Sequence, residues 1–199
     1  MIGKHLKIKS RLRLLNDFLT IVLILLAIYI FALPLVPQIS WYNSKPTPIA
    51  KSHQHVVSPK QAVVYHPAGN ELVIPSINLN QPIFTGTSIY TVNLGVWMRP
   101  NGSTPDKGSN TIFVGHRFTY TNPRGVFYFL GNIRIGDSIV VYWQNKTYIY
   151  QVDQIKVVVP TDTSVENPTT NPIVTLYTCT PLWSLKDRLV IIASEVSVQ

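Results

Sequence analysis

The stretch IVTLYTCTPLWSLKDRLVIIASEV, residues 173–196, decides the fold of this chain. It contains two runs rich in β-branched and apolar residues, 173–179 and 188–196, joined by an eight-residue connection. Runs of this kind, separated by Pro, Ser and Asp, predict two strands, and the short connection predicts a hairpin. In such a hairpin Arg188, which opens the second strand, lies alongside Cys179, which closes the first.

Similar runs continue upstream as far as residue 71, separated by Pro, Gly, Asn and Asp. A region of ~130 residues buries one core of ordinary size, and many strands with few helical periods predict a mainly β fold. A closed barrel or sandwich is favoured over a doubly wound sheet. We expect residues 93–110 to form a turn-rich loop, and only 88–93 and 124–132 to leave room for short helical turns.

The N-terminal part carries an apolar run without charge at residues 18–36. At ~1.5 Å per helical residue this run can cross a hydrocarbon layer about 30 Å thick. Residues 1–17 hold five bases and one acid, which predicts that this basic segment is cytoplasmic. A cleaved signal peptide has the same charge order, but its apolar region is shorter and precedes a small-x-small site. We expect 18–36 to be a single transmembrane helix in the cell membrane.

Residues 37–70 are expected to form an extracellular stalk, with the folded domain at 71–199 outside the cell. The stalk is rich in Pro, Ser, Thr, Lys, Gln and His, with too few regularly spaced apolar residues to bury a face. Its His53 and His55 lack a third ligand and a rigid frame for a metal. Half of the +8 net charge lies in the basic N-terminal segment, and the other bases are scattered, so binding to nucleic acid is not expected.

The chain has a single cysteine, Cys179, and a lone thiol on an oxidising exterior calls for an explanation. A nucleophilic cysteine needs a base or cation beside it, because at the reference pKa only about 3% of a free thiol is ionised at pH 7. Of the five histidines, only His116 lies well inside the folded domain. Acyl transfer also needs a group that stabilises an oxyanion, and Arg188 is placed to do so.

The pattern TLYTC, residues 175–179, resembles the T-L-x-T-C signature of sortases, the membrane-anchored cysteine transpeptidases of bacterial surfaces. GHR at 115–117 and DRLVI at 187–191 resemble the other two sortase signatures, in the same order. The resemblance implies an eight-stranded β-barrel, with Cys179 ending strand seven and Arg188 beginning strand eight. It also implies that the catalytic residues are His116, Cys179 and Arg188.

The resemblance further implies a mechanism and its partners. A Cys179 thiolate attacks the carbonyl after the threonine of an LPxTG-like sorting signal on a secreted protein. His116 then protonates the leaving amine, and Arg188 holds the oxyanion. An amine acceptor, either a cell-wall peptide or a pilin lysine, resolves the thioester, whereas water releases the protein as a side reaction. With independent titration at reference pKa values, about 3% thiolate and about 24% imidazolium leave roughly 1% of molecules correctly charged at pH 7.

Substrate-binding roles are implied for Thr178, Thr175 and Pro168, the last lying in a loop at 161–172 that occupies the place of the signal-reading loop. We expect no cofactor and no required metal, although two acidic residues of this loop resemble calcium ligands of class A sortases. The sequence is most similar to classes D and E, which favours housekeeping anchoring. A pilin-polymerising sortase and a non-catalytic anchored β-barrel that only binds a partner remain open.

Overall fold

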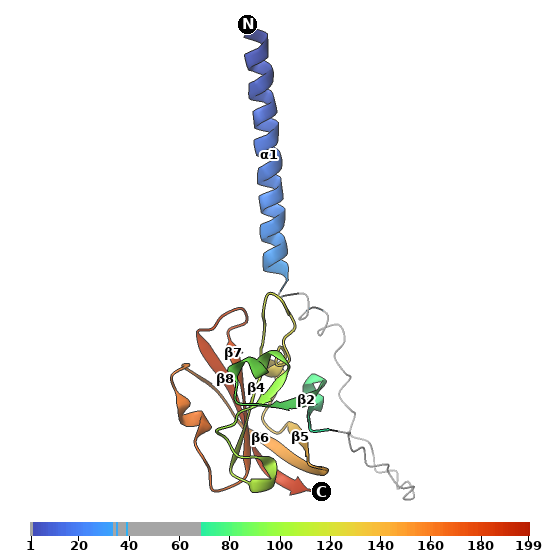
Figure 1. The fold of residues 1–199 in the computed structure, drawn as a ribbon, viewed down its shortest axis with the longest axis vertical. Helices are drawn as coiled ribbons and strands as arrows, with labels where there is room; N and C mark the ends of the chain where they lie inside the picture. Colours follow the sequence, from blue (N-terminus) through green and yellow to red (C-terminus); the bar gives the residue numbers. More distant parts are fainter. Residues whose placement is uncertain (1, 34, 36–38, 40–68) are drawn as a thin grey trace, which may run out of the picture. The chain divides into compact units, whose positions relative to one another are not determined.

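The computed structural model describes residues 2–33, 35, 39 and 69–199. The chain divides into two units, residues 1–50 and 51–199. Most of the expected stalk at 37–70 lies outside the described residues. The first unit contains one α-helix, and the second contains the β-domain with its short 3₁₀ turns (Figure 1).

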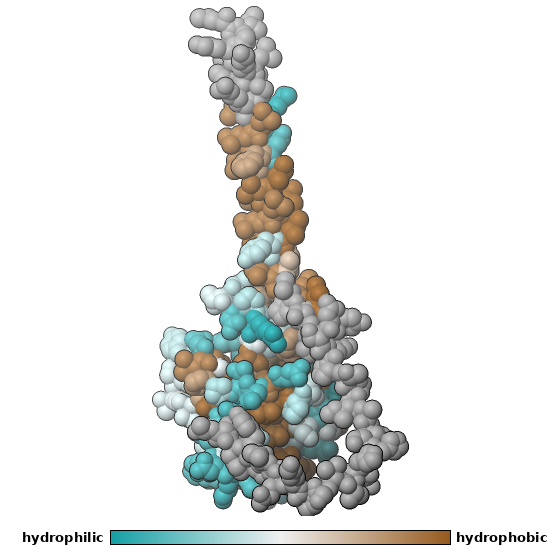
Figure 2. All heavy atoms as spheres, turned by 90° about the vertical axis from the view of Figure 1, so that its right-hand side faces the viewer, coloured by the Kyte–Doolittle hydropathy of each residue, from teal (hydrophilic) through white to brown (hydrophobic). Residues whose placement is uncertain are grey.

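Helix α1 spans Ile2–Ala32 and includes a stretch, Leu12–Ala32, that is long and apolar enough to cross a membrane. Figure 2 shows mostly apolar side chains on the visible face of this stretch, with hydrophilic ones near its start. The helix ends four residues before the expected end at residue 36. Pro34 follows in the sequence, and a proline disfavours helical conformation at the residue before it, so the earlier end has a local cause.

Eight strands close into a barrel in the order β1-β2-β3-β4-β7-β8-β6-β5, which confirms the predicted mainly β fold. Neighbouring strands are antiparallel except for two parallel pairs, β2 with β3 and β4 with β7. The strands are β1 (Glu71–Ile74), β2 (Leu79–Thr85), β3 (Val96–Met98), β4 (Asn110–Val114), β5 (Ser138–Trp143), β6 (Lys146–Val158), β7 (Ile173–Thr180) and β8 (Asp187–Val198).

The barrel interior is filled by side chains that alternate along the strands. In β5, for example, Ile139, Val141 and Trp143 are buried, while the residues between them are more exposed. This period of two is the signature of a strand with one face on a core. The largest fully buried side chains are Tyr128, Tyr150, Phe113, Phe127, Leu72, Ile74, Ile112, Leu130, Ile139, Leu176, Ile191 and Val96.

Two expectations about the connections were wrong. The region 93–110 contains a strand, β3, whose three residues are all buried between β2 and β4. Within residues 69–199, five 3₁₀ turns form rather than two. Those expected near 88–93 and 124–132 are present. Of the other three, two begin with a proline at the first helical position, and one begins with an aspartate cap. The turns are η1 (Pro75–Ile77), η2 (Ile89–Asn93), η3 (Pro105–Lys107), η4 (Leu130–Asn132) and η5 (Thr163–Glu166).

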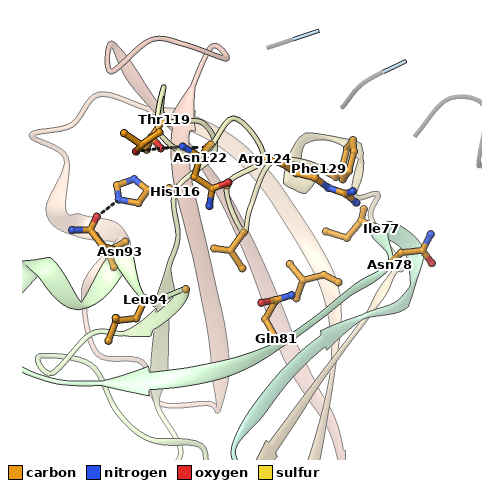
Figure 3. Close-up of a pocket in the computed structure, with 16 residues that line it drawn as sticks. Ile77, Asn78, Gln81, Asn93, Leu94, His116, Thr119, Asn122, Arg124 and Phe129 are labelled. Carbon is orange, nitrogen blue, oxygen red and sulfur yellow. Dashed lines mark hydrogen bonds between the residues drawn. The ribbon is translucent and has the colours of Figure 1, made fainter. Parts of the chain in front are cut away.

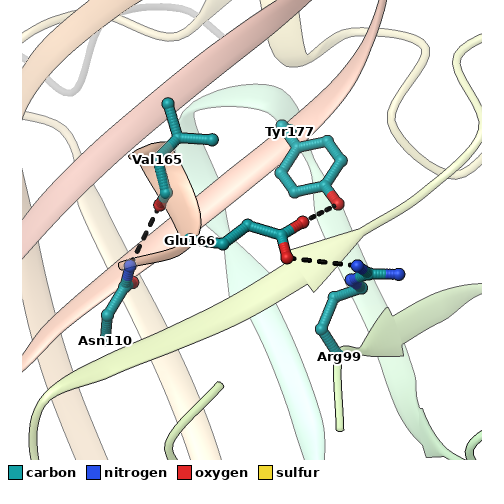
Figure 4. Close-up of polar contacts among 5 residues, drawn as sticks. All are labelled: Arg99, Asn110, Val165, Glu166 and Tyr177. Atoms are coloured by element: carbon teal, nitrogen blue, oxygen red, sulfur yellow. Dashed lines mark hydrogen bonds and ion pairs between the residues drawn. The ribbon is translucent and has the colours of Figure 1, made fainter. Parts of the chain in front are cut away.

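A half-buried polar network fastens the loop between β6 and β7 to the barrel (Figure 4). Arg99 forms an ion pair with Glu166 at 3.1 Å, and the Tyr177 hydroxyl donates to the other carboxylate oxygen at 2.5 Å. Burial, and then this bond to Glu166, raises the pKa of Tyr177 and keeps its phenol protonated. The three side chains therefore tie η5 both to the segment after β3 and to β7.

Asn110, at the start of β4, provides a second and fully buried attachment for the same loop. Its amide nitrogen donates to the carbonyl oxygens of Val165 and Asn167, at 3.0 Å each. Its amide oxygen accepts the hydroxyl of Thr175 at 2.8 Å. Because Asn110 is only 3% exposed and Val165 is also buried, the loss of this donor leaves the carbonyl of Val165 buried without a partner.

The substitution Asn110→Asp keeps the shape of this side chain but replaces its two donors with a carboxylate oxygen facing two carbonyls. Each unsatisfied buried carbonyl costs about 1–3 kcal/mol, so we expect the melting temperature to fall by several degrees. Amide hydrogens of residues 163–172 should also exchange faster, as measured by hydrogen-exchange mass spectrometry. The matched control is Asn80→Asp at an exposed position of β2. Equal effects of the two substitutions would contradict the anchoring role of Asn110.

Candidate active site

The register of three neighbouring strands brings the expected catalytic residues together. The strands β4 and β7 pair in parallel as far as Val114 and Tyr177, and His116 and Cys179 each follow that pair by two residues. The strands β7 and β8 are antiparallel and place Cys179 directly opposite Arg188. Opposite residues in antiparallel strands have Cβ atoms about 4.5–5.5 Å apart, so the ladder itself sets Arg188 beside the cysteine.

His116, Cys179 and Arg188 all line one cavity of about 410 Å³. Cys179 is a free thiol with intermediate exposure, so a substrate carbonyl can approach it. Other parts of the wall come from η2, the residues around β3 and the β6–β7 loop. The structure thus gathers the three predicted catalytic residues around a single space, at the end of β7.

His116 is oriented by a contact with η2. Its Nε2 lies 2.9 Å from the side-chain oxygen of Asn93. An amide oxygen only accepts hydrogen bonds, so Nε2 carries the hydrogen in this contact. Burial lowers the pKa of His116 from its ordinary value, because an imidazolium is poorly solvated there. At neutral pH the imidazole is therefore mainly uncharged in the free protein.

The segment after β4 folds back over the main chain of His116, and glycine makes this approach possible. The amide of Phe127 donates to the carbonyl of His116 at 2.9 Å. A Cβ on Gly125 would lie 2.3 Å from that same carbonyl oxygen, and a Cβ on Gly115 would lie 2.8 Å from the Phe127 ring. Both glycines are thus required by close packing around the histidine.

Thr178 ties β7 to the residue before His116. It contributes to the wall of the 410 Å³ cavity, but it is only 2% exposed and its hydroxyl donates to the carbonyl of Gly115 at 2.8 Å. The hydroxyl is therefore engaged within the protein. In this structure the residue fixes the position of the chain entering His116 relative to Cys179.

Arg117 was quoted in the GHR motif but was given no role by the sequence. Its guanidinium donates to the Thr180 hydroxyl at 2.9 Å, which joins the residue after His116 to the residue after Cys179. Burial lowers the pKa of Arg117, and the nearby Tyr128 and Cys179 act in the opposite direction. A second guanidinium therefore lies close enough to Cys179 for the two charges to interact.

The guanidinium of Arg188 is held by carbonyls of the connection that precedes it. Its Nη1 lies 3.1 Å from the carbonyl oxygens of both Leu185 and Asp187. One end of the planar fork is thus anchored on the β7–β8 connection, while the side chain also lines the cavity that contains Cys179. Arg188 thus lines the same cavity as Cys179 while part of its guanidinium is bonded to main-chain carbonyls.

Two expected substrate-binding residues do not reach the cavity. Thr175 is fully buried, and its hydroxyl is donated to Asn110 under the β6–β7 loop. Pro168 lies on the exposed part of that loop, outside the cavity lining. The loop does contribute to the cavity, but through residues nearer its start: Asp162, Thr163, Val165 and Glu166.

The acidic residues of this loop are engaged with protein groups. Glu166 accepts from Arg99 and Tyr177, and Asp162 caps η5 by accepting from the amide and hydroxyl of Ser164. Within the described residues no three His, Cys, Asp or Glu side chains are grouped as a metal site. Glu166 is thus paired with a guanidinium, that of Arg99.

Sequence reasoning missed Asn93, Arg117 and Arg99. Arg117 adjoins His116 in the chain, so its place next to the site could have been anticipated from that adjacency. Asn93 contacts His116 from the end of η2, and Arg99 lines the cavity from the segment after β3, which was expected to be a turn-rich loop. No pattern in the sequence indicates that either one contacts His116 or Glu166.

Comparison with known proteins agrees with this geometry. A family model for the sortase domain matches residues 72–196. The chain is 31% identical over 136 residues to Sortase SrtE1 of Streptomyces coelicolor, a match covering 60% of this chain and 38% of that protein. It is 30% identical over 98 residues to Sortase D of Bacillus subtilis, covering 49% of this chain and 46% of that protein. The matches thus span less than half the length of these relatives.

A solved structure of sortase C1 from Streptococcus agalactiae superposes with a TM-score of 0.58 and 31% identity. The superposition covers 65% of this chain and 69% of that one. The matched range reaches from β1 to β8 and includes His116, Cys179 and Arg188, which line the same cavity. The chain belongs to the sortase family.

Proposed function

We propose that this chain is a membrane-anchored cysteine transpeptidase acting on secreted proteins that carry a C-terminal sorting signal. It cleaves an LPxTG-like signal through a thioester on Cys179 and transfers the acyl group to an amine of the cell surface. The observation that carries the proposal is the convergence of His116, Cys179 and Arg188 on one cavity, set by the register of β4, β7 and β8.

In the first half-reaction the Cys179 thiolate attacks the scissile carbonyl and forms a tetrahedral oxyanion. Arg188, directly across the ladder, donates to that oxyanion. His116 as imidazolium gives its proton to the leaving amine, the carbon–nitrogen bond breaks, and the thioester remains. The acyl part of the signal then lies in the 410 Å³ cavity, against the wall formed by η5.

We expect turnover to be slow because of the charge state of His116. Burial lowers the pKa of His116, so at pH 7 the imidazolium fraction is smaller than the ~24% of an unperturbed histidine. The imidazolium that the first half-reaction needs is therefore present in only a minority of molecules at neutral pH, which slows turnover.

The proposal also places helix α1 in the cell membrane as a single anchor, with its N-terminus in the cytoplasm and the barrel outside. The apolar stretch Leu12–Ala32 and the basic residues before it support this arrangement. The similarity to proteins named SrtE1 and Sortase D supports a class D or E enzyme with a housekeeping role. Pilin polymerisation, with a pilin lysine as the acceptor, is the second candidate, supported by the likeness to a sortase C1.

The test of this function is mass spectrometry of products from a library of sorting-signal peptides, with and without amine acceptors. We expect cleavage after one residue of the signal, a thioester mass on Cys179, and a ligated product only when an amine is present. The control is Cys179→Ala, which removes a single sulfur atom and should abolish both products while the melting temperature stays close to that of the parent. Cleavage by Cys179→Ala at near the parental rate would refute the enzyme proposal.

The role of Arg188 is tested by comparing Arg188→Lys with Arg188→Ala. If the planar fork holds the oxyanion by directed hydrogen bonds, lysine keeps the charge but loses the geometry. Acylation, measured as single-turnover thioester formation, should then fall by about 100-fold or more in both variants. Arg134→Lys, at an exposed site, is the control and should acylate as the parent does. Acylation by Arg188→Lys at close to the parental rate would show that charge alone suffices.

A further inference from the structure

His116 also lines a second cavity, of about 540 Å³ (Figure 3). Its walls are formed by β2, by η2 and by the segment that follows β4. The two cavities share His116 and Val92, but Cys179 lines only the first of them. The two cavities therefore adjoin at His116 and Val92.

The second cavity is lined by neutral polar groups and one guanidinium, that of Arg124. No carboxylate side chain is among its described lining residues. Arg124 is exposed, and its guanidinium carbon lies 5.0 Å from the centre of the Phe129 ring. Within the described part of the chain the one ion pair joins Arg99 and Glu166, so no acidic side chain there neutralises Arg124. The neutral polar residues are Asn78, Gln81, Asn93, Thr119, Thr121 and Asn122.

The proton transfers of the proposed reaction require both amines to reach His116. On acylation the leaving amine takes its proton from the imidazolium. On resolution an incoming amine attacks the thioester carbonyl, the carbon–sulfur bond breaks, the Cys179 thiolate is restored, and the amine proton passes to the imidazole. A group that accepts this proton must lie within about 2.6–3.2 Å of the amine, or one water away. The acyl chain occupies the cavity beside Cys179, which leaves the second cavity at His116 for the amine.

We infer that the 540 Å³ cavity is the acceptor site and that it takes an amine which carries a carboxylate on the same molecule, as a short peptide does. The carboxylate lies against Arg124 and the amine against His116, on opposite sides of the cavity (Figure 3). This assignment rests on the proposed transpeptidase function. The same guanidinium disfavours a protonated amine in the cavity, and only the neutral amine is a nucleophile.

The lowered pKa of His116 fits this use of the cavity. Once the leaving amine has taken the proton, the imidazole is neutral, and burial favours that form. A rival entry route is a third cavity, of about 300 Å³, lined by Cys179 and by exposed apolar side chains that include Trp183 and Leu185. His116 does not line it, so an amine there has no described histidine to take its proton.

The test uses the full chain in detergent and a peptide that forms the Cys179 thioester. Triglycine and triglycinamide serve as acceptors, since they differ only in the carboxylate. The readout is the ratio of their kcat/KM values for ligation, taken within each variant so that changes in thioester formation cancel. We expect the parent to prefer triglycine by roughly fivefold to tenfold, as one exposed charge-assisted contact allows.

Arg124→Gln should bring this ratio to about one, and Arg124→Glu should invert it, a change that a merely structural role of Arg124 would not produce. The matched control Arg134→Gln, at another exposed arginine, should keep the parental ratio. A ratio near one in the parent, or a parental ratio in Arg124→Gln, would overturn the assignment. A ratio that changes in Trp183→Ala but not in Arg124→Gln would place the acceptor in the third cavity instead.

The two proposals fail in different ways. If no peptide leaves a thioester on Cys179, the transpeptidase function is wrong, and the acceptor site falls with it. If the thioester forms and amines resolve it without regard to their carboxylate, the function stands and only the acceptor assignment is wrong.

Discussion

The register of β4, β7 and β8 is the constraint on which the proposed chemistry depends. The parallel pairing of β4 with β7 places His116 and Cys179 each two residues past their last paired residues, and the antiparallel pairing of β7 with β8 sets Arg188 opposite the cysteine. A shift of one residue in either ladder would turn a side chain to the opposite face of the sheet. The buried core under these strands prevents such a shift, so the stability of the barrel and the geometry of the site share one cause.

Local hydrogen bonds add to the positioning of His116 and Cys179 that the strand pairing provides. The Thr178 hydroxyl holds the carbonyl of Gly115, and the Arg117 guanidinium holds the hydroxyl of Thr180, so residues next to His116 are tied to residues next to Cys179 on both sides. Both hydrogen bonds are made within the protein, so other groups must bind the substrate. His116 itself lines two adjoining cavities, of which only one is also lined by Cys179.

The sequence predicted the mainly β domain, the hairpin that pairs Cys179 with Arg188, and the choice of His116, because these follow from alternation, spacing and elimination. It did not predict β3, because the three residues of this strand, Val96–Met98, are too few for a periodic pattern. Alternation correctly places Thr175 on the same side of β7 as Cys179. It cannot show that Asn110 and the β6–β7 loop cover that part of the face, which is why Thr175 is buried.

Polar contacts between residues far apart in the chain could not be predicted from the sequence either. The ion pair between Arg99 and Glu166 joins residues 67 positions apart, and the contact between Asn93 and His116 joins residues 23 apart. Such pairs depend on how loops close over the barrel, and loop closure leaves no periodic signal in a sequence. The cavity lined by Arg124 could not be predicted from the sequence either, because it exists only once η2, β2 and the segment after β4 have packed together.

The most direct measurement of the central claim is the pH dependence of Cys179 alkylation by iodoacetamide, followed by intact mass in the parent, Arg188→Gln and Arg134→Gln. If the ladder places Arg188 beside the thiol, its charge favours the thiolate. The pH at half-maximal alkylation should then move upward in Arg188→Gln and stay unchanged in Arg134→Gln. Superimposable profiles for all three proteins would contradict the account, because they would mean that the cation across the ladder does not act on the cysteine.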